Sequence, residues 1–405
     1  MNNAPNIILS CVGLSFAAAI GLEILYTAAL LEFLIYAAWR NRRILFYYRA
    51  ARIVTYVLYL SFYWESGLYM SNGGDDFSFY SRHLTKDYSF DEIFSGVFFN
   101  FPWFYLVNKY LISLVPNVPS EYVVVYLASF NNVIWALIAK KYHDISRMTG
   151  SNRGHLIWWF TPMLFTSSIL LRDIWIYFCF ISVYQLHLAN KLTFRRFAVY
   201  ILISFFTRPE SGVLILIFVL STNFKKSLLI YVAAILWIFS FTDLNVLALF
   251  RDYEVLQEIY FSNKDVANIN ESGIAIRLMN IEGLLGSIIW MFYNLFKPLP
   301  PIVFSHFSVG NLMLLFGNIF NYVIVLYFIM KSIRMPKMLL NREFLFFIIG
   351  IGIVSFIGGT QRHTYHFLIP ILLLFGRENK LVRFSFYRAV ALSPMILIPI
   401  YLLLL

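Results

Sequence analysis

The sequence predicts an all-α protein that crosses a membrane many times, and three observations lead to this class. Of the 405 residues, 60% are hydrophobic and only 13% are charged, too little polar surface to cover a soluble chain. The apolar residues form continuous runs rather than the alternating pattern of a membrane barrel. The basic residues gather in short stretches between these runs. Because one span needs ~20 apolar residues, the length allows about 11–13 transmembrane helices, with re-entrant or interfacial helices on the outer face.

The chain is expected to form one integral membrane domain over residues 1–405, with outer loops at 71–120 and 243–308. No internal repeat, heptad pattern or low-complexity linker divides it. Cys11 and Cys179 both lie in apolar runs, so neither a disulfide framework nor a cysteine metal site is predicted. The N-terminal MNNAPN lacks a basic region, so no cleavable signal is expected.

The net charge of +11 is distributed in a way that indicates membrane topology rather than nucleic-acid binding. Six clusters hold 22 of the 32 Lys and Arg residues but only three of the 21 acidic residues. By the positive-inside rule these clusters are predicted to be cytoplasmic connections, and functional groups are expected on the opposite face. The clusters are Arg40, Arg42, Arg43, Arg49 and Arg52; Lys140, Lys141, Arg147 and Arg153; Lys191, Arg195 and Arg196; Lys225 and Lys226; Lys331, Arg334, Lys337 and Arg342; and Arg377, Lys380, Arg383 and Arg388.

The first third of the chain predicts three or four spans. Residues 7–39 form one tilted span or two short ones, which leaves the side of the N-terminus open. After the basic connection 40–52, a span over 53–70 leads outward. The apolar segment 94–115 is predicted to be re-entrant or surface-lying, because a crossing there would put Lys140 and Lys141 outside. A span over 122–139 then returns to the cytoplasm.

Two short hairpins and a group of later spans complete the predicted topology. The first hairpin, 156–171 and 174–190, turns at Leu171-Arg172-Asp173. The second, 197–207 and 211–224, turns at Thr207-Arg208-Pro209-Glu210, where Pro209 ends the helix. The later segments are a span at 227–241, a polar stretch at 243–282, a re-entrant piece at 283–308, and spans at 310–330, 344–357, 364–376 and 389–405.

An outer loop reading SNGGDDFSFYSRH carries two adjacent carboxylates, Asp75 and Asp76, after two glycines that permit a tight turn. An ordinary hydrated turn explains this pattern. The functional interpretation is that one carboxylate accepts a proton from an attacking sugar hydroxyl. A divalent cation between the two acids stays open, although no other cofactor or metal site is predicted. Tyr80 and Arg82 of the same loop are candidate substrate-binding residues.

Three further outer turns place arginine beside acids or histidines at membrane depth. They hold Arg172 with Asp173, Arg208 with Glu210, and Arg362 with His363 and His366. Each pair alone is explained by a snorkelling arginine and its neighbouring acid. Three arginines in short turns on one side instead favour an anionic substrate, since guanidinium donors suit phosphate oxygens. Arg172, Arg208 and Arg362 are therefore candidate catalytic residues, with Asp173, Glu210, His363 and His366 as candidate substrate-binding residues.

The motifs GGDDFSFY, PMLFTSSILLRD, TRPE and QRHTYHFLIP, in this order, resemble the layout of bacterial oligosaccharide repeat-unit polymerases of the Wzy type. These enzymes belong to a broader group of polyprenyl-dependent membrane glycosyltransferases. The resemblance implies an inner-membrane enzyme that joins undecaprenyl-pyrophosphate-linked repeat units on the periplasmic side. It also implies that Arg172, Arg208 and Arg362 handle the donor pyrophosphate. The late outer loop, 243–308, departs from the family because it is acid-rich rather than basic.

The expected partners are lipid-linked glycans and membrane lipids, with no nucleic acid. Whether a chain-length regulator is needed is left open. Two other functions also stay open at this point. One is transfer of single sugars from a polyprenyl monophosphate, which yields one sugar per acceptor rather than a ladder. The other is a flippase or transporter, which usually shows internal repeats and charged groups near the bilayer midplane.

Overall fold

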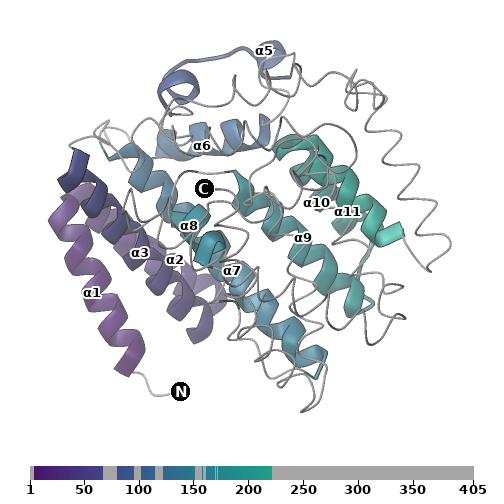
Figure 1. Ribbon diagram of the computed structural model, residues 1–405, viewed down its shortest axis with the longest axis horizontal. Helices are drawn as coiled ribbons and strands as arrows, with labels where there is room; N and C mark the ends of the chain where they lie inside the picture. The colour runs from purple at the N-terminus through teal and green to yellow at the C-terminus, as the bar shows by residue number, and fades with distance from the viewer. Residues whose placement is uncertain are drawn as a thin grey trace, which may run out of the picture. The chain divides into compact units, whose positions relative to one another are not determined.

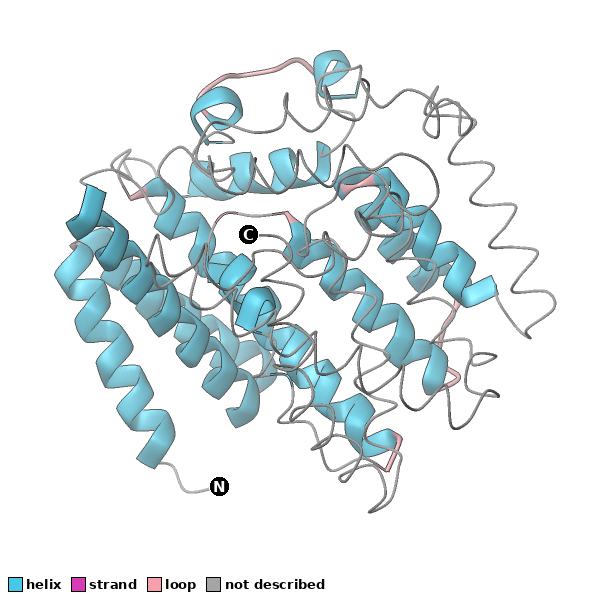
Figure 2. Cartoon of the chain, in the orientation of Figure 1, coloured by secondary structure: helices cyan, strands magenta, loops and turns pink. Residues whose placement is uncertain are grey.

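The computed structural model describes residues 4–66, 80–94, 102–114, 122–150, 157, 161–168, 170 and 172–220. The chain divides into two compact units, Met1–Met148 with Asn152–Gly212, and Thr149–Ser151 with Val213–Leu405. Every described helix lies in the first unit, apart from the last one, which ends in the second. The described residues form helices and no strand (Figure 2), so the predicted all-α class is confirmed for this part of the chain.

The N-terminal apolar run forms two helices, α1 (Ala4–Ile20) and α2 (Leu22–Trp39), rather than one continuous helix, and whether each crosses the membrane stays a prediction. They break at Gly21, where a Cβ atom would come 3.2 Å from the ring of Tyr122. At its other end α2 stops at Arg40, whose left-handed backbone (φ 44°) lets its N–H donate to the Tyr36 carbonyl at 2.9 Å.

Helix α3 (Arg42–Ser66) packs against α1 and α2 and against the long helix α7 (Val123–Met148). The prediction that residues 40–52 form a connection was wrong, because α3 starts at Arg42. Its Arg49 and Arg52 find acceptors on the two preceding helices.

Helix α7 lies at the centre of the first unit and packs against α3, α8 (Thr161–Ser168) and α9 (Asp173–Leu188). The fully buried Trp135 meets the ring of Tyr47 edge to face at 5.8 Å. Asn132 donates to the hydroxyl of Thr55 on α3 at 2.9 Å, which satisfies two buried polar side chains together. Helix α7 continues beyond the predicted span 122–139, through Lys140 and Lys141 to Met148.

Helices α9 and α10 (Phe194–Thr207) form an antiparallel pair. The turn between them uses Asn190 in the left-handed region (φ 53°), where asparagine is tolerated, and begins α10 with Thr193 as its N-cap. Phe178 and Tyr200 join the two helices through their rings, with centroids 6.0 Å apart. A second tight turn then leads into α11 (Pro209–Leu220).

Shorter helices lie at one end of this unit: the π-helical turn η1 (Tyr80–Leu84), α5 (Phe90–Phe94) and α6 (Pro102–Leu114). Figure 1 shows α6 across the top of the view with α5 above it. Helix α6 contacts η1, α7 and α10, and Lys109 ties it to the chain before α5 by donating to the carbonyls of Leu84 and Lys86 at 3.0 Å each. Helix α6 has 13 residues, fewer than a membrane span needs, and the predicted re-entrant or surface-lying placement of segment 94–115 stays a prediction.

Two described helices, α2 and α7, are long and apolar enough to cross a membrane by length and composition, and α1 is apolar but shorter. The number of spans, the membrane topology and the single-domain organisation stay predictions.

Candidate functional site

Two of the predicted turns come together at the α6 end of the unit. The guanidinium of Arg208, at the end of α10, lies 3.7 Å from the carboxylate of Asp173, the first residue of α9. The Asp173 side chain is buried, with 3% exposed, and that of Arg208 is 17% exposed. The pair is an ion pair rather than a hydrogen bond, because 3.7 Å exceeds hydrogen-bond distance. Asp173 also makes contacts of its own within the protein.

The local sequence explains why Arg208 stands at this place. Arg208 precedes Pro209, which disfavours helical backbone in the preceding residue, and it adopts extended φ and ψ of −162° and 110°. Pro209 then begins α11, where the missing N–H costs nothing. Gly212 completes the turn, since a Cβ there would come 2.9 Å from the Cα of Phe205. The predicted role of Pro209 as a helix terminator is confirmed.

Arg208 and Asp173 lie at the end of the unit away from the basic helix ends. Lys141 on α7 donates to Gln185 near the end of α9 at 3.1 Å, and Arg43 at the start of α3 acts electrostatically on His143. The N-terminal end of α3 and the C-terminal ends of α7 and α9 therefore meet at one place. Because α9 runs from Asp173 towards that place, the Arg208–Asp173 pair lies at the opposite end.

The other predicted site residues fall into three groups. Arg172 directly precedes α9, is half-buried and accepts a backbone hydrogen bond from Trp175 at 3.0 Å, while Tyr80 is half-buried in η1. Arg82 and Glu210 lie in η1 and α11, and their side chains are outside the description. Asp75, Asp76, Arg362, His363 and His366 lie outside the described residues.

Two tryptophans lie on α6 and α9; from the sequence, Trp103 was considered only as one of several outer aromatics that could stack on sugar faces, and Trp175 was not singled out. Trp103 on α6 and Trp175 on α9 meet edge to face with ring centroids 5.7 Å apart. Trp175 is two residues from Asp173, and α6 also contacts α10. No local pattern links these tryptophans, because 71 residues separate them and the interfacial belts of membrane proteins hold many others.

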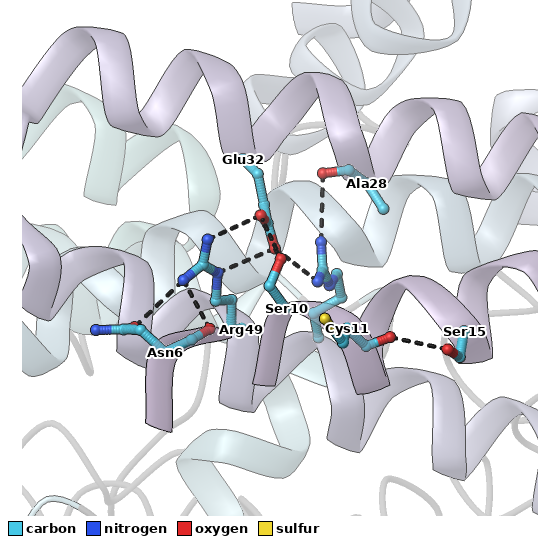
Figure 3. Close-up of polar contacts among 8 residues, drawn as sticks. Asn6, Ser10, Cys11, Ser15, Ala28, Glu32 and Arg49 are labelled. Atoms are coloured by element: carbon cyan, nitrogen blue, oxygen red, sulfur yellow. Dashed lines mark hydrogen bonds and ion pairs between the residues drawn. The ribbon is translucent and has the colours of Figure 1, made fainter. Parts of the chain in front are cut away.

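A second polar cluster was missed altogether, and it is centred on Glu32 of α2 (Figure 3). Arg49 donates to the two oxygens of Glu32 at 3.1 and 2.9 Å, Arg52 donates at 2.7 Å and Ser10 at 2.8 Å. Arg49 also donates to the Asn6 carbonyl at 2.8 Å. One carboxylate therefore joins α1, α2 and α3 through two arginines.

Burial makes the Glu32 cluster structural. The Arg52 side chain is fully buried, and those of Arg49 and Glu32 are 15% and 13% exposed. Gly13 on α1 makes room for the guanidinium, since a Cβ there would come 2.6 Å from Arg52 Nη2. The sequence carried a signal for this cluster: a carboxylate inside an apolar run needs a cationic partner, and the nearest cations follow in 40–52.

Within the described residues, no three His, Cys, Asp or Glu side chains are grouped so that they could hold a metal ion. The predicted carboxylate pair Asp75 and Asp76 lies outside those residues, so a divalent cation there stays open. No protein-family model, curated protein or solved structure matches the chain.

Proposed function

We propose that this protein polymerises oligosaccharide repeat units linked to undecaprenyl pyrophosphate, on the periplasmic face of the bacterial inner membrane. One observation carries the proposal. Arg208 and Asp173 come from separate turns and meet at the end of the helical unit opposite the basic helix ends. An arginine in loose contact with a single carboxylate keeps donors available for an anionic substrate.

In the proposed reaction Arg208 holds the pyrophosphate of the donor glycan, with Arg172 and Arg362 as further cations. A hydroxyl oxygen of the acceptor glycan forms a bond to the anomeric carbon of the donor. The bond between that carbon and the pyrophosphate oxygen breaks, and the lipid pyrophosphate leaves with the electron pair. Asp75 or Asp76 accepts the proton of the attacking hydroxyl. Because guanidinium groups neutralise charge as it develops on the leaving group, they stabilise the transition state more than the ground state.

The ion pair with Asp173 gives Arg208 a fixed position before substrate arrives. Burial of Asp173 at the first turn of α9 places its negative charge at the positive end of the helix, which stabilises the carboxylate. The carboxylate in turn orients the guanidinium without holding it at hydrogen-bond distance.

The test is a complementation experiment in a strain that lacks the chromosomal copy. Arg208→Ala is expected to lower the yield of long glycan chains by about 100-fold or more, the cost of removing one preorganised donor from a developing charge. Arg195→Ala is the matched control, because Arg195 is an exposed arginine at the other end of α10. Both variants must reach wild-type levels in the membrane.

The product pattern distinguishes the outcomes. A normal ladder from Arg208→Ala contradicts the assignment. Product with one added sugar per acceptor, from the wild-type protein supplied with purified lipid-linked substrate, contradicts polymerisation and indicates a single-sugar transferase.

A further inference from the structure

Among the described residues, three buried hydrogen-bond donors on α6, α9 and α10 have no acceptor. They are the indole nitrogens of Trp103 and Trp175 and the hydroxyl of Ser204 on α10. Ser204 is fully buried. Leaving such a group unsatisfied costs about 1–3 kcal/mol, so each one calls for a partner.

Ser204 differs from comparable hydroxyl groups nearby. On α9, Ser182 donates to the carbonyl of Phe178 at 2.6 Å, and on α10, Thr207 donates to that of Ile203 at 2.6 Å. This bond to the carbonyl four residues earlier is the usual way for a hydroxyl group to satisfy itself in a helix. Ser204 makes no such bond, although it lies on the same helix as Thr207.

The pairing of α9 with α10 fixes the level of Ser204 along α9. Between α9 and α10, the contact of Phe178 with Tyr200 lies below Ser204 and the contact of Asp173 with Arg208 lies above it. Ser204 is therefore at the level of the first turn of α9, which carries Trp175. Trp103 reaches Trp175 from α6, which also contacts α10.

The side chains of Trp103, Trp175, Ser204 and Arg208 can all act as hydrogen-bond donors. An indole N–H can only donate, a guanidinium can only donate, and a serine hydroxyl can do so. The guanidinium of Arg208 lies beyond hydrogen-bond distance of Asp173. A ligand that fits must offer several acceptor oxygens and negative charge, which describes a phosphate or pyrophosphate group.

We propose that Trp103, Trp175 and Ser204 bind the phosphate oxygens of the substrate together with Arg208. This inference rests on the proposed function and adds three neutral donors to the site. Neutral donors add hydrogen bonds to the pyrophosphate oxygens without adding positive charge to the site.

The experiment uses the full-length protein in phosphatidylcholine nanodiscs, with tryptophan labelled with ¹⁵N at the indole nitrogen. The probes are inorganic pyrophosphate and farnesyl pyrophosphate. Saturating probe is expected to move the indole N–H signals of Trp103 and Trp175 downfield, as hydrogen bonds to phosphate oxygens form. A shift with inorganic pyrophosphate shows recognition of the phosphates alone, whereas a shift with farnesyl pyrophosphate only shows that the lipid is also needed; both support the proposal.

Substitutions that keep an aromatic side chain and remove the indole N–H measure the contribution of that donor. Trp103→Phe and Trp175→Phe are each expected to weaken probe binding about tenfold, the value of one hydrogen bond to a charged group. Ser204→Ala is expected to weaken it by a similar factor. Trp39→Phe is the matched control, because Trp39 is exposed at the end of α2, and it should bind the probe as the wild type does.

Indole signals that do not move with either probe, or unchanged affinity in all three variants, overturn the proposal, since the donors then bond to water. This failure is distinguishable from failure of the proposed function. If Arg208→Ala abolishes the glycan ladder while the indole signals stay in place, the function stands and the phosphate site is wrong. If the signals move but Arg208→Ala keeps a normal ladder, the site stands and the polymerase assignment is wrong.

Discussion

The first unit contains two arginine–carboxylate sites, and they differ in how closely the arginines approach the carboxylate. At Glu32, three hydrogen bonds of 2.7–3.1 Å from two arginines, together with two from Ser10 at 2.8 and 3.1 Å, join three helices. At Asp173, the guanidinium of Arg208 lies 3.7 Å away, and Asp173 makes further contacts within the protein. Both carboxylates are largely buried.

This difference separates a structural cluster from a candidate binding site. Both oxygens of the Glu32 carboxylate already accept hydrogen bonds from Arg49, Arg52 or Ser10, which holds the carboxylate in place, although the buried Nε of Arg52 has no acceptor among the described residues. The guanidinium of Arg208 keeps N–H donors available for a ligand, and its ion pair with Asp173 therefore contributes less to stability. Substitutions that remove one carboxylate at a time can measure the difference.

The largest effect is expected from Glu32→Gln. The change keeps the volume but leaves Arg49 and the fully buried Arg52 without a counter-charge, which should lower the free energy of unfolding by about 3–5 kcal/mol. Thermal unfolding in detergent, followed by circular dichroism, measures it. Glu23→Gln is the matched control, because Glu23 is an exposed carboxylate on the same helix and its loss should have almost no effect. Equal stability of the two variants would show that the Glu32 cluster is not structural.

Gly13→Ala is expected to have the next largest effect. Two contributions of opposite sign to the free energy of unfolding compete in this variant, so the direction of the net change is the test. Helix propensity alone predicts that alanine stabilises α1 by about 1 kcal/mol. The new Cβ would instead come 2.6 Å from Arg52 Nη2, and Arg52 is held by Glu32, so we expect a net loss of about 1–3 kcal/mol. The same unfolding measurement checks the prediction, and a more stable variant would mean that Arg52 moves aside freely.

Asp173→Asn tests the other side of the comparison. The substitution removes one loose ion pair and the favourable charge at the start of α9, so it should cost about 1 kcal/mol, well below the cost of Glu32→Gln. Thermal unfolding of both variants in the same detergent compares the free-energy cost of Asp173→Asn with that of Glu32→Gln. A loss as large as that of Glu32→Gln would make the Asp173–Arg208 pair structural and would weaken its claim to a substrate role.

The sequence predicted the features that depend on local chemistry and missed those that depend on packing. Helical class, the turn at Arg172 and the break at Pro209 follow from apolar runs and from the backbone limits of proline. Arg49 and Arg52 were assigned to an exposed connection because charge counting treats every arginine as hydrated. Their partner Glu32 lies 17 and 20 residues away on a different helix. The meeting of Trp103 with Trp175 is equally invisible, since it requires the packing of α6 against the rest of the unit.

The smallest effect is expected in the short helix α5, whose N-terminus is stabilised by hydrogen bonds between residues close in sequence. Ser89 and Glu92 form a capping box: the Ser89 amide and hydroxyl donate to the Glu92 carboxylate at 2.7 and 2.8 Å, and the Glu92 amide donates back to the Ser89 hydroxyl at 3.3 Å. The hydrogen bonds from the Ser89 amide and then its hydroxyl lower the pKa of Glu92 below its ordinary value of 4.5. A lowered pKa in the folded state means that the carboxylate stabilises α5 above the unfolded pKa, and that this contribution is lost as pH falls through the folded value.

Ser89→Ala should therefore raise the pKa of Glu92 towards 4.5, which an NMR titration of the glutamate carboxyl carbon measures, and should speed amide exchange in α5. Ser113→Ala on α6 serves as the control, because Ser113 donates only within its own helix, to Tyr110, at 2.6 Å. An unchanged Glu92 titration in Ser89→Ala would contradict the capping box. The Glu32 and Asp173 variants should leave this titration unaltered, because the capping box draws on residues three apart in sequence and needs no contact between distant helices.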